Sequence, residues 1–457
     1  MRPEVTRLGA TLHDELIAEA TKALFRITGV GAELSLKQAA LPVDKAGLGY
    51  TSAVDTADAA WAGSWAASFP RIKALIRPLR HVDPRSSKLP ALESLKGALL
   101  RVEKVRSDVA SIYSGFDGAV VRTNRWGERQ AKFHPPGLPT SSVSIGDIAA
   151  AAYSIPKAQR QLVQAAHHRR WLDCYYERHN QGRAAAAQFV SASQPFAGHF
   201  LHAVPSAEDL RIPSVAFELI VQRRLRAPLS LLANVRHSRS LNRALDEFGD
   251  TLANDHNHST RHAEMLRKWA QALRAAYGSS GVKLEDKACG TYSPDTQPDI
   301  TRKHAHGRGK HALYEGKLVS AVSTGEAGTG EAGGYVAFGN TADPLRQDIK
   351  GAPATRTAAA VPGAYRYPLR QGHSVTMIIH EIDGGFGPDA VKLLNTMANK
   401  HGNNRLGAEA LVAPWCARSF KTRYAMRISI AIHSGVAAEI IETVETDTAM
   451  MHGCATA

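Results

Sequence analysis

The sequence predicts a multidomain α+β protein in which a mostly helical N-terminal half precedes an α/β core. Its 457 residues exceed what one hydrophobic core usually supports. Before residue 280, apolar residues recur mainly at helical spacing, as at 9–29 and from Met265 to Tyr277. After residue 280, the apolar run SVTMIIHE at 374–381 is typical of a buried strand, and the following Gly-Gly turn and Pro388 indicate the start of a helix.

The charge of the chain indicates its class of partner. The sequence has 56 Lys and Arg against 42 Asp and Glu, a net charge of +14. This excess predicts a polyanion, RNA or DNA, and an inert basic surface is the alternative. No run of about 18 apolar residues occurs, so no membrane span is expected. Four cysteines without a close pair favour a reducing, intracellular compartment, such as the nucleus or an organelle with RNA.

Residues 1–70 are expected to form a helical segment. The helix at 9–29 has one apolar side, and the Gly47-Leu48-Gly49 turn that follows requires small residues. Small residues at 52–67 would allow close helix packing, with Trp61 and Trp65 four positions apart on one face.

Residues 71–230 are expected to form a basic helical linker, with ten Lys and Arg against three Asp and Glu in 71–106 alone. A helical stretch at 145–187 interleaves basic residues with aromatic ones, which could pair phosphates and stack bases. The pattern favours the other interpretation, that its aromatic residues are buried in a helix bundle. The candidate contact residues are Arg169, Arg170, Trp171 and Tyr175.

Another helix is predicted from Ser214 to Leu225, with Ser214 as its N-cap. Arg223, Arg224 and Arg226 lie near its C-terminal end, where cations complement the helix dipole. A later helix, after the His-rich segment, is predicted from an apolar stripe that includes Met265, Trp269 and Leu273.

Several segments occur in the order found in one known family. They are LPVDKAGLGYTSA at 41–53, LHAVPS at 201–206, FGD at 248–250, SVTMIIHEIDGGFGPDAVKLL at 374–394 and ARSFKTRYAMRISIAIHSGVA at 417–437. Together they resemble the C-terminal half of the reverse transcriptase polyprotein of non-LTR retrotransposons that carry a restriction-like endonuclease. The resemblance implies a thumb-like segment at 1–70, a linker at 71–230, a degenerate zinc knuckle with its helix at 231–280, a restriction-endonuclease-like domain at 281–437 and a tail at 438–457.

The resemblance also implies roles for particular residues. The region around His202, Arg223, Arg224 and Arg226 would hold element RNA or target DNA. The polymerase palm would precede residue 1, so this chain is not expected to polymerise nucleic acid.

The knuckle is expected to hold no metal. The family has a histidine where Thr251 stands here, and no cysteine lies between Cys174 and Cys289. Four residues with side chains that bind zinc remain, but without thiolates we expect them to form part of a metal-free loop and the start of a helix. They are Asp255, His256, His258 and His262.

A restriction-like nuclease needs two carboxylates on adjacent strands for Mg²⁺ and a nearby lysine. Asp299 would be the first carboxylate, but Leu318 stands where the family has the second. Glu315 and Lys317 have the spacing of a replacement pair. Because Gly316 lies between them, the sequence favours an exposed hairpin tip within 311–322 instead.

We therefore predict a retroelement-derived nucleic-acid-binding protein without catalytic activity and without a cofactor. It would act as an RNA-binding or scaffold component of a ribonucleoprotein, alongside other proteins of that complex. The alternative is an active Mg²⁺-dependent endonuclease that uses Asp299, Glu315 and Lys317. A third interpretation is a structural subunit whose basic face binds acidic proteins.

Overall fold

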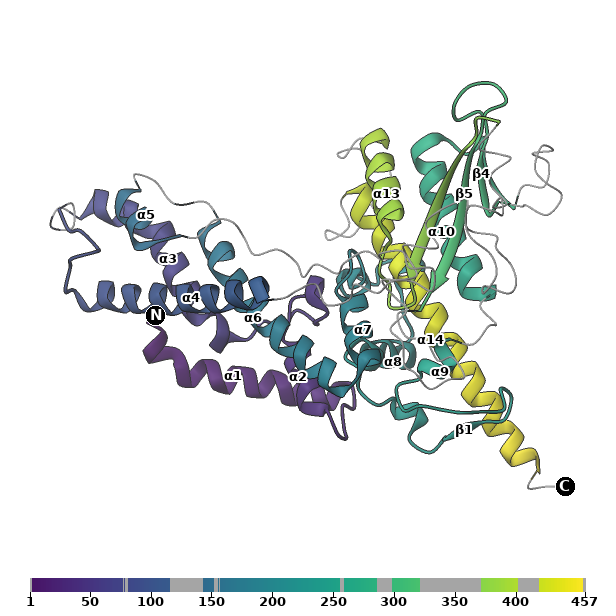
Figure 1. Ribbon diagram of the computed structural model, residues 1–457, viewed down its shortest axis with the longest axis horizontal. Helices are drawn as coiled ribbons and strands as arrows, with labels where there is room; N and C mark the ends of the chain where they lie inside the picture. The colour runs from purple at the N-terminus through teal and green to yellow at the C-terminus, as the bar shows by residue number, and fades with distance from the viewer. Residues whose placement is uncertain are drawn as a thin grey trace.

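The computed structural model describes residues 2–76, 78, 81–115, 143–151, 155, 157–254, 259–285, 298–320, 371–401 and 419–454. These residues form an α+β fold, as predicted, with a helical N-terminal part beside a C-terminal part that contains the main sheet (Figure 1). Among them, no helix is both apolar enough and long enough to cross a membrane.

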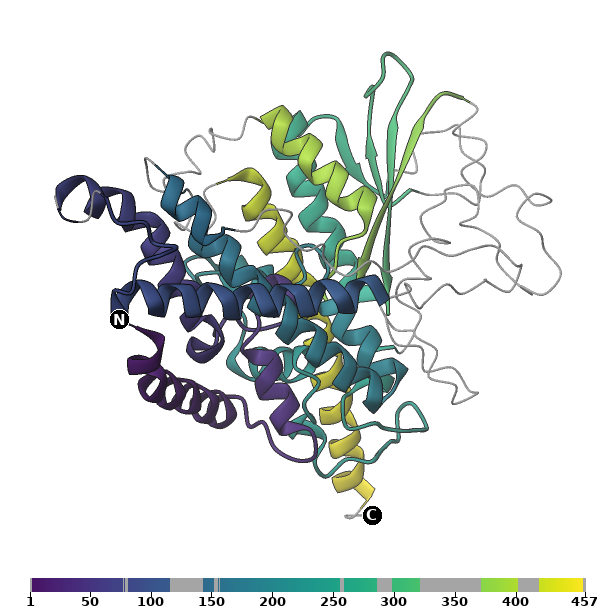
Figure 2. The same ribbon diagram turned by 60° about the vertical axis from the view of Figure 1, so that its left-hand side comes forward.

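The N-terminal part is built from long helices that pack side by side (Figure 2). They are α1 (Pro3–Leu24), α2 (Ala32–Ala39), α3 (Ala53–Leu75), α4 (Pro90–Gly115), α5 (Ile145–Ala150), α6 (Ala158–Gln181) and α7 (Arg183–Ala192). Ser52 caps α3 by accepting a hydrogen bond from the backbone N–H of Asp55 at 3.1 Å. Gly63 within α3 lies against the backbone of Gln159 in α6, where a Cβ atom would be only 2.5 Å from the Gln159 Cα. The small residues predicted for this helix therefore do allow a close approach.

Between the two parts lie α8 (Ser214–Arg224), a two-stranded hairpin of β1 (His237–Ser238) and β2 (Arg243–Ala244), and the short helix α9 (Asp250–Ala253). The predicted helix after Pro213 is present, but Ser214 is its first residue and makes no side-chain cap.

The main sheet has four strands in the order β3 (Val282–Leu284), β4 (Ile300–Arg302), β5 (Ala312–Val319) and β6 (Ser374–Glu381). The first three pair antiparallel, whereas β6 runs parallel to β5. The predicted buried strand at 374–381 is confirmed. The hairpin predicted within 311–322 is wrong, because β5 continues through Gly316 as one strand.

Helices α10 (Ser259–Tyr277), α13 (Pro388–His401) and α14 (Phe420–Cys454) pack together on one face of this sheet. The predicted stripe on α10 is confirmed, since Met265, Trp269 and Leu273 are fully buried. Helix α14, yellow in Figure 1, then continues past α8, α9 and the β1–β2 hairpin. Residues 438–454, expected as a tail, therefore continue the helix whose predicted bounds were 417–437.

Candidate functional site

The candidate site lies at the start of β4, beside the part of β5 that β4 does not pair with. Ile300, the first residue of β4, pairs with Tyr314, so no strand residue of β4 faces Gly316. The Asp299 carboxylate accepts the N–H of Gly316 at 2.7 Å, and Nε2 of His262 lies 3.0 Å from the Gly316 carbonyl oxygen. The same His262 nitrogen is 3.7 Å from Oδ2 of Asp299. Helix α10 and the start of β4 thus meet at this point of β5.

Glu315 and Lys317 lie on β5 beside Asp299. Side chains alternate along a strand, so these two share a face, while Tyr314 and Gly316 face α10. Oε1 of Glu315 is 2.6 Å from Nζ of Lys317. In contrast to the predicted exposed tip, the Glu315 side chain is only 12% exposed. The Asp299 carboxylate, from the residue just before β4, therefore lies close to the Glu315 carboxylate of the adjacent strand β5, and the lysine is next to them.

Gly316 allows this arrangement because it has no side chain. A Cβ atom there would come within 2.6 Å of Leu266 and 2.9 Å of Met265 on α10. The glycine that indicated a turn in the sequence is instead required by the close approach of a helix.

Electrostatics makes Asp299 unusual for an aspartate. Its burial, and secondarily the negative charge of Glu315, raise its pKa to about 6, whereas the hydrogen bond from Gly316 opposes this rise. Burial and the neighbouring carboxylate therefore both disfavour the ionised form of Asp299, and a cation bound beside it would favour that form.

The donor set suits a hard divalent cation. No group of three or more His, Cys, Asp or Glu side chains that could hold a metal ion occurs among the described residues. Mg²⁺, however, commonly binds through one or two carboxylates and completes its shell with water and substrate phosphate. Asp299 and Glu315 could provide those two carboxylates, and the raised pKa of the partly buried Asp299, which a bound cation would lower, fits such an ion.

The aromatic residues predicted to stack on bases are buried. Trp171 is 0% exposed, stacks on Tyr175 with ring centroids 5.5 Å apart, and donates its indole N–H to Ser193 at 3.0 Å. Tyr175 is 8% exposed. The predicted interface is corrected for these two residues: both belong to the core between α6 and α7, because the apolar side of an amphipathic helix packs inward.

Arg169 and Arg170 reach the surface of α6 but pair with carboxylates. Arg169 lies 3.1 Å from Asp173, and Arg170 forms an ion pair with Asp55. They line a groove of about 900 Å³ whose charged residues nearly balance, with six basic and five acidic ones. These are Arg7, Lys37, Arg101, Lys104, Arg169 and Arg170 against Asp55, Asp58, Asp108, Asp173 and Glu177. A groove of this kind attracts a polyanion weakly.

The arginines at the end of α8 form a buried network, which corrects their predicted place in the interface. Arg223 donates to the Phe248 carbonyl at 3.0 Å and lies 3.7 Å from both Asp250 and Asp383. Arg226 is 3.0 Å from Asp250, and its guanidinium lies 4.3 Å from the Phe248 ring centre.

Arg224, only 3% exposed, donates to the carbonyls of Val43 at 2.6 Å and Gly47 at 3.1 Å. These cations join α8 to the FGD turn and to the loop before α3. Of the residues predicted near this interface, His202 is the exposed one.

The FGD turn is held by hydrogen bonds. Asp246 accepts from the backbone N–H groups of Phe248, Asp250 and Thr251 at 2.7–2.9 Å. Thr251, which stands where the family has histidine, also donates its hydroxyl to Asp246 at 2.8 Å. Residues 255–258, which include the candidate ligands Asp255, His256 and His258, lie outside the described residues.

At the end of β6, Glu381 is fully buried and accepts a hydrogen bond from the Ser191 hydroxyl of α7. Its other carboxylate oxygen finds no partner among the described residues, and burial raises the pKa of Glu381 to about 8. Because the folded pKa exceeds the unfolded one, the folded state holds a proton that the unfolded state releases. Stability is therefore expected to fall as pH rises from about 4.5 to about 8, by up to about 1.4 kcal/mol per pH unit.

We expect Glu381→Gln, which is neutral at every pH, to remove this decline. Urea midpoints measured from pH 6.5 to 8 check it, since buried histidines with lowered pKa values, such as His433, titrate below that window. The exposed Glu445→Gln is the matched control. An unchanged slope in Glu381→Gln would show that this carboxyl is not the group that titrates.

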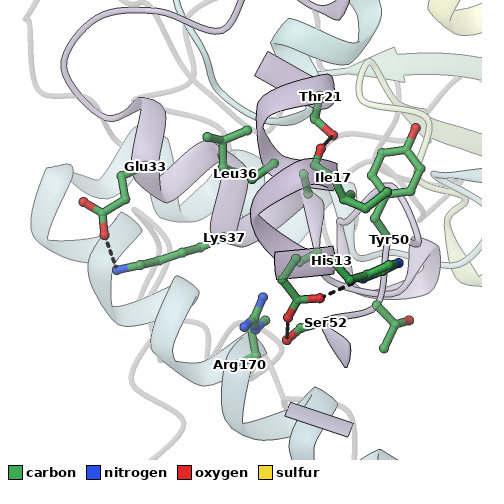
Figure 3. A pocket seen from close by; sticks show the side chains of 14 residues that line it. His13, Ile17, Thr21, Glu33, Leu36, Lys37, Tyr50, Ser52 and Arg170 are labelled. Atoms are coloured by element: carbon green, nitrogen blue, oxygen red, sulfur yellow. Dashed lines mark hydrogen bonds and ion pairs between the residues drawn. The ribbon is translucent and has the colours of Figure 1, made fainter. Parts of the chain in front are cut away.

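A separate cavity of about 450 Å³ lies between α1, α2, the residues just before α3 and Arg170 of α6 (Figure 3). Its polar residues mostly satisfy one another. Asp14 accepts from the Ser52 hydroxyl at 2.6 Å and from backbone N–H groups at the start of α3, while Lys37 lies 3.2 Å from Glu33. Asp14 thus acts from α1 as a second cap of α3, which is a structural role.

The sequence indicated Asp299, Glu315 and Lys317 through their types and spacing, but it gave His262 no role at this site. His262 is 54 positions from Gly316, and only the packing of α10 against β5 brings them together. Comparisons of the chain with protein-family models, with curated proteins and with solved structures found no match.

Proposed function

We propose that the α/β part of this protein hydrolyses phosphodiester bonds of nucleic acid in a Mg²⁺-dependent reaction. The observation that carries the proposal is the position of Glu315 and Lys317 within β5, next to Asp299. Two carboxylates and an amine on adjacent strands are the groups that a restriction-like nuclease requires.

Each residue would have a definite task. Asp299 and Glu315 would hold Mg²⁺, which would neutralise charge on the phosphodiester and activate a water molecule when bound. Lys317, whose side chain is 39% exposed, would place its ammonium group against a phosphate oxygen. His262 of α10 contacts the Gly316 carbonyl, and Asp299 accepts the Gly316 N–H. These two contacts would hold the site in place against α10.

Nucleic-acid binding without cleavage, as by a retroelement-derived component of a ribonucleoprotein, is the second candidate function. It is favoured by the direct pairing of Lys317 with Glu315, which keeps the amine on a carboxylate rather than available to substrate. The net charge of +14 supports both candidates, since each requires a polyanion.

A plasmid-nicking assay separates them. Purified full-length protein is incubated with supercoiled DNA in Mg²⁺, Mn²⁺ or EDTA, alongside Asp299→Asn and the exposed control Glu445→Gln. We expect native protein and the control to nick DNA with either metal, and Asp299→Asn to be slower by at least about 100-fold. Equal nicking by Asp299→Asn would contradict the proposal, and salt-sensitive binding without nicking would favour the second candidate.

A further inference from the structure

The loop between β4 and β5 is an exposed, strongly basic element. Residues 303–311, KHAHGRGKH, contain Lys303, Arg308 and Lys310, and no Asp or Glu occurs anywhere in 300–314. Residues 306–310 are fully on the surface. Arg308 and Lys310 make no ion pair within the part of the chain that the structure describes. Arg308 and Lys310 thus differ from the arginines of α6 and α8, which form ion pairs with carboxylates or donate to backbone carbonyls.

Histidines give the loop a defined shape. The N–H of Gly309 donates to Nδ1 of His304 at 3.2 Å, the N–H of His304 donates to Nδ1 of His311 at 3.1 Å, and the N–H of His311 donates to Nδ1 of His373 at 2.9 Å. The last step ties the loop to the start of β6. Because a backbone N–H only donates, each of these Nδ1 atoms is an acceptor, and the neutral ring carries its proton on Nε2.

Ring stacking and turn geometry support the same shape. The rings of His311 and His373 are nearly parallel with centroids 5.1 Å apart, and His306 contacts the Ser374 hydroxyl at 2.8 Å. Gly307 and Gly309 have φ values of 107° and 79°, in the region that favours glycine. The loop therefore presents Arg308 and Lys310 from a backbone that hydrogen bonds and ring stacking hold in one conformation.

This loop is not arranged as a metal site. The Nδ1 atoms already accept backbone hydrogen bonds, and no cluster able to hold a metal ion is found among the described residues. A neutral imidazole with Nδ1 engaged in this way offers an N–H donor at Nε2, which suits an anionic oxygen.

We propose that the β4–β5 loop, residues 303–311, is a phosphate-binding element that holds the backbone of a nucleic acid, and this inference rests on the proposed function. The loop begins at Lys303, four residues and roughly 13 Å of strand beyond Asp299, so the loop and the proposed site would contact different parts of one nucleic-acid backbone. Arg308 and Lys310 would provide the positive charge. The hydrogen-bonded histidines His304, His311 and His373 would hold the loop in the conformation that presents them.

The test measures binding separately from cleavage. Full-length protein in EDTA is titrated into fluorescein-labelled duplex DNA, and in a second arm into labelled single-stranded RNA, over a salt series read by anisotropy. We expect the double variant Arg308→Ala/Lys310→Ala to bind about 10-fold or more weakly and to reduce the slope of log affinity against log salt by about 2. The arm with the larger loss identifies the nucleic acid that the loop binds.

The matched control removes two exposed arginines from another hairpin. Arg239→Ala/Arg243→Ala, around the β1–β2 turn, changes the net charge equally and should change binding much less. Equal losses in the two double variants would overturn the proposal, because general charge would then explain both. Unchanged binding by Arg308→Ala/Lys310→Ala would overturn it as well.

A third variant tests the role of the histidines. His304→Ala removes the acceptor for the Gly309 N–H and leaves Arg308 and Lys310 in the sequence. We expect weaker binding in EDTA, whereas affinity equal to the native protein would show that the hydrogen-bonded histidines do not position the cations. If the protein does not nick DNA but its binding still depends on the loop, only the proposed nuclease activity is contradicted. If the protein nicks DNA and its binding does not depend on the loop, only the proposed role of the loop is contradicted.

Discussion

Asp299→Asn is expected to make the metal-free protein more stable while it removes the proposed activity. The native carboxyl is ionised at pH 7.5 at a cost, since burial and Glu315 raise its pKa to about 6. Asparagine avoids that cost and still offers an oxygen to the Gly316 N–H. We expect a gain in the free energy of unfolding on the order of 1–3 kcal/mol.

The pH dependence gives the sign of this effect. A carboxyl with a raised folded pKa contributes full stability below its unfolded pKa, and this contribution is lost as pH rises through about 6. The advantage of Asp299→Asn should therefore be larger at pH 7.5 than at pH 5. Added Mg²⁺ should stabilise the native protein but not the variant, because ligand binding to the folded state raises stability.

Urea denaturation at pH 5 and 7.5, in EDTA and in Mg²⁺, measures all four conditions. The exposed Glu445→Gln serves as the control for loss of a surface charge in the same part of the protein. A destabilised Asp299→Asn would show instead that this carboxylate is a structural group of β5 whose charge the fold requires.

Arg223→Ala should destabilise the protein by about 3–5 kcal/mol, because it leaves Asp383 buried without its cation. Burial already raises the pKa of Asp383, and the charge of Arg223 opposes that rise. The substitution also removes the donor to the Phe248 carbonyl, whereas Asp250 keeps Arg226. The contact between α8, the FGD turn and the Gly-Gly turn would therefore weaken.

The exposed Arg243→Ala removes the same charge from β2 and should change stability by less than about 0.5 kcal/mol. Pairing Arg223→Ala with Asp383→Asn should recover part of the loss, with a coupling energy of about 0.5–3 kcal/mol. If Arg223→Ala leaves the urea midpoint unchanged but weakens nucleic-acid binding, the predicted interface role of Arg223 is right and its buried structural role is wrong.

Much of the local structure followed from the sequence. The period of Met265, Trp269 and Leu273 predicted α10, the apolar run at 374–381 predicted β6, and Pro388 marked the start of α13. Each of these depends on which face of one element is apolar and on which residues begin or end it. Such information is local, so the elements and the α+β class could be stated before the structure was known.

The outcome at Gly316 was not local. A glycine between Glu315 and Lys317 indicates a turn. In the structure, however, α10 packs so closely on β5 that only glycine fits at this position, and the strand continues through it. Burial of Arg223, Arg224 and Trp171 likewise depends on which helices lie beside them. By itself, the sequence determined the elements, the surplus of positive charge and the three residue types that a nuclease needs. Tertiary packing alone decided that Asp299, Glu315 and Lys317 lie together. It also decided that Arg308 and Lys310 of the β4–β5 loop are exposed, whereas Arg223 and Arg224 of α8 are buried. The physical reason is that contacts between distant segments depend on how their surfaces pack, which the periodicity of a single segment does not specify.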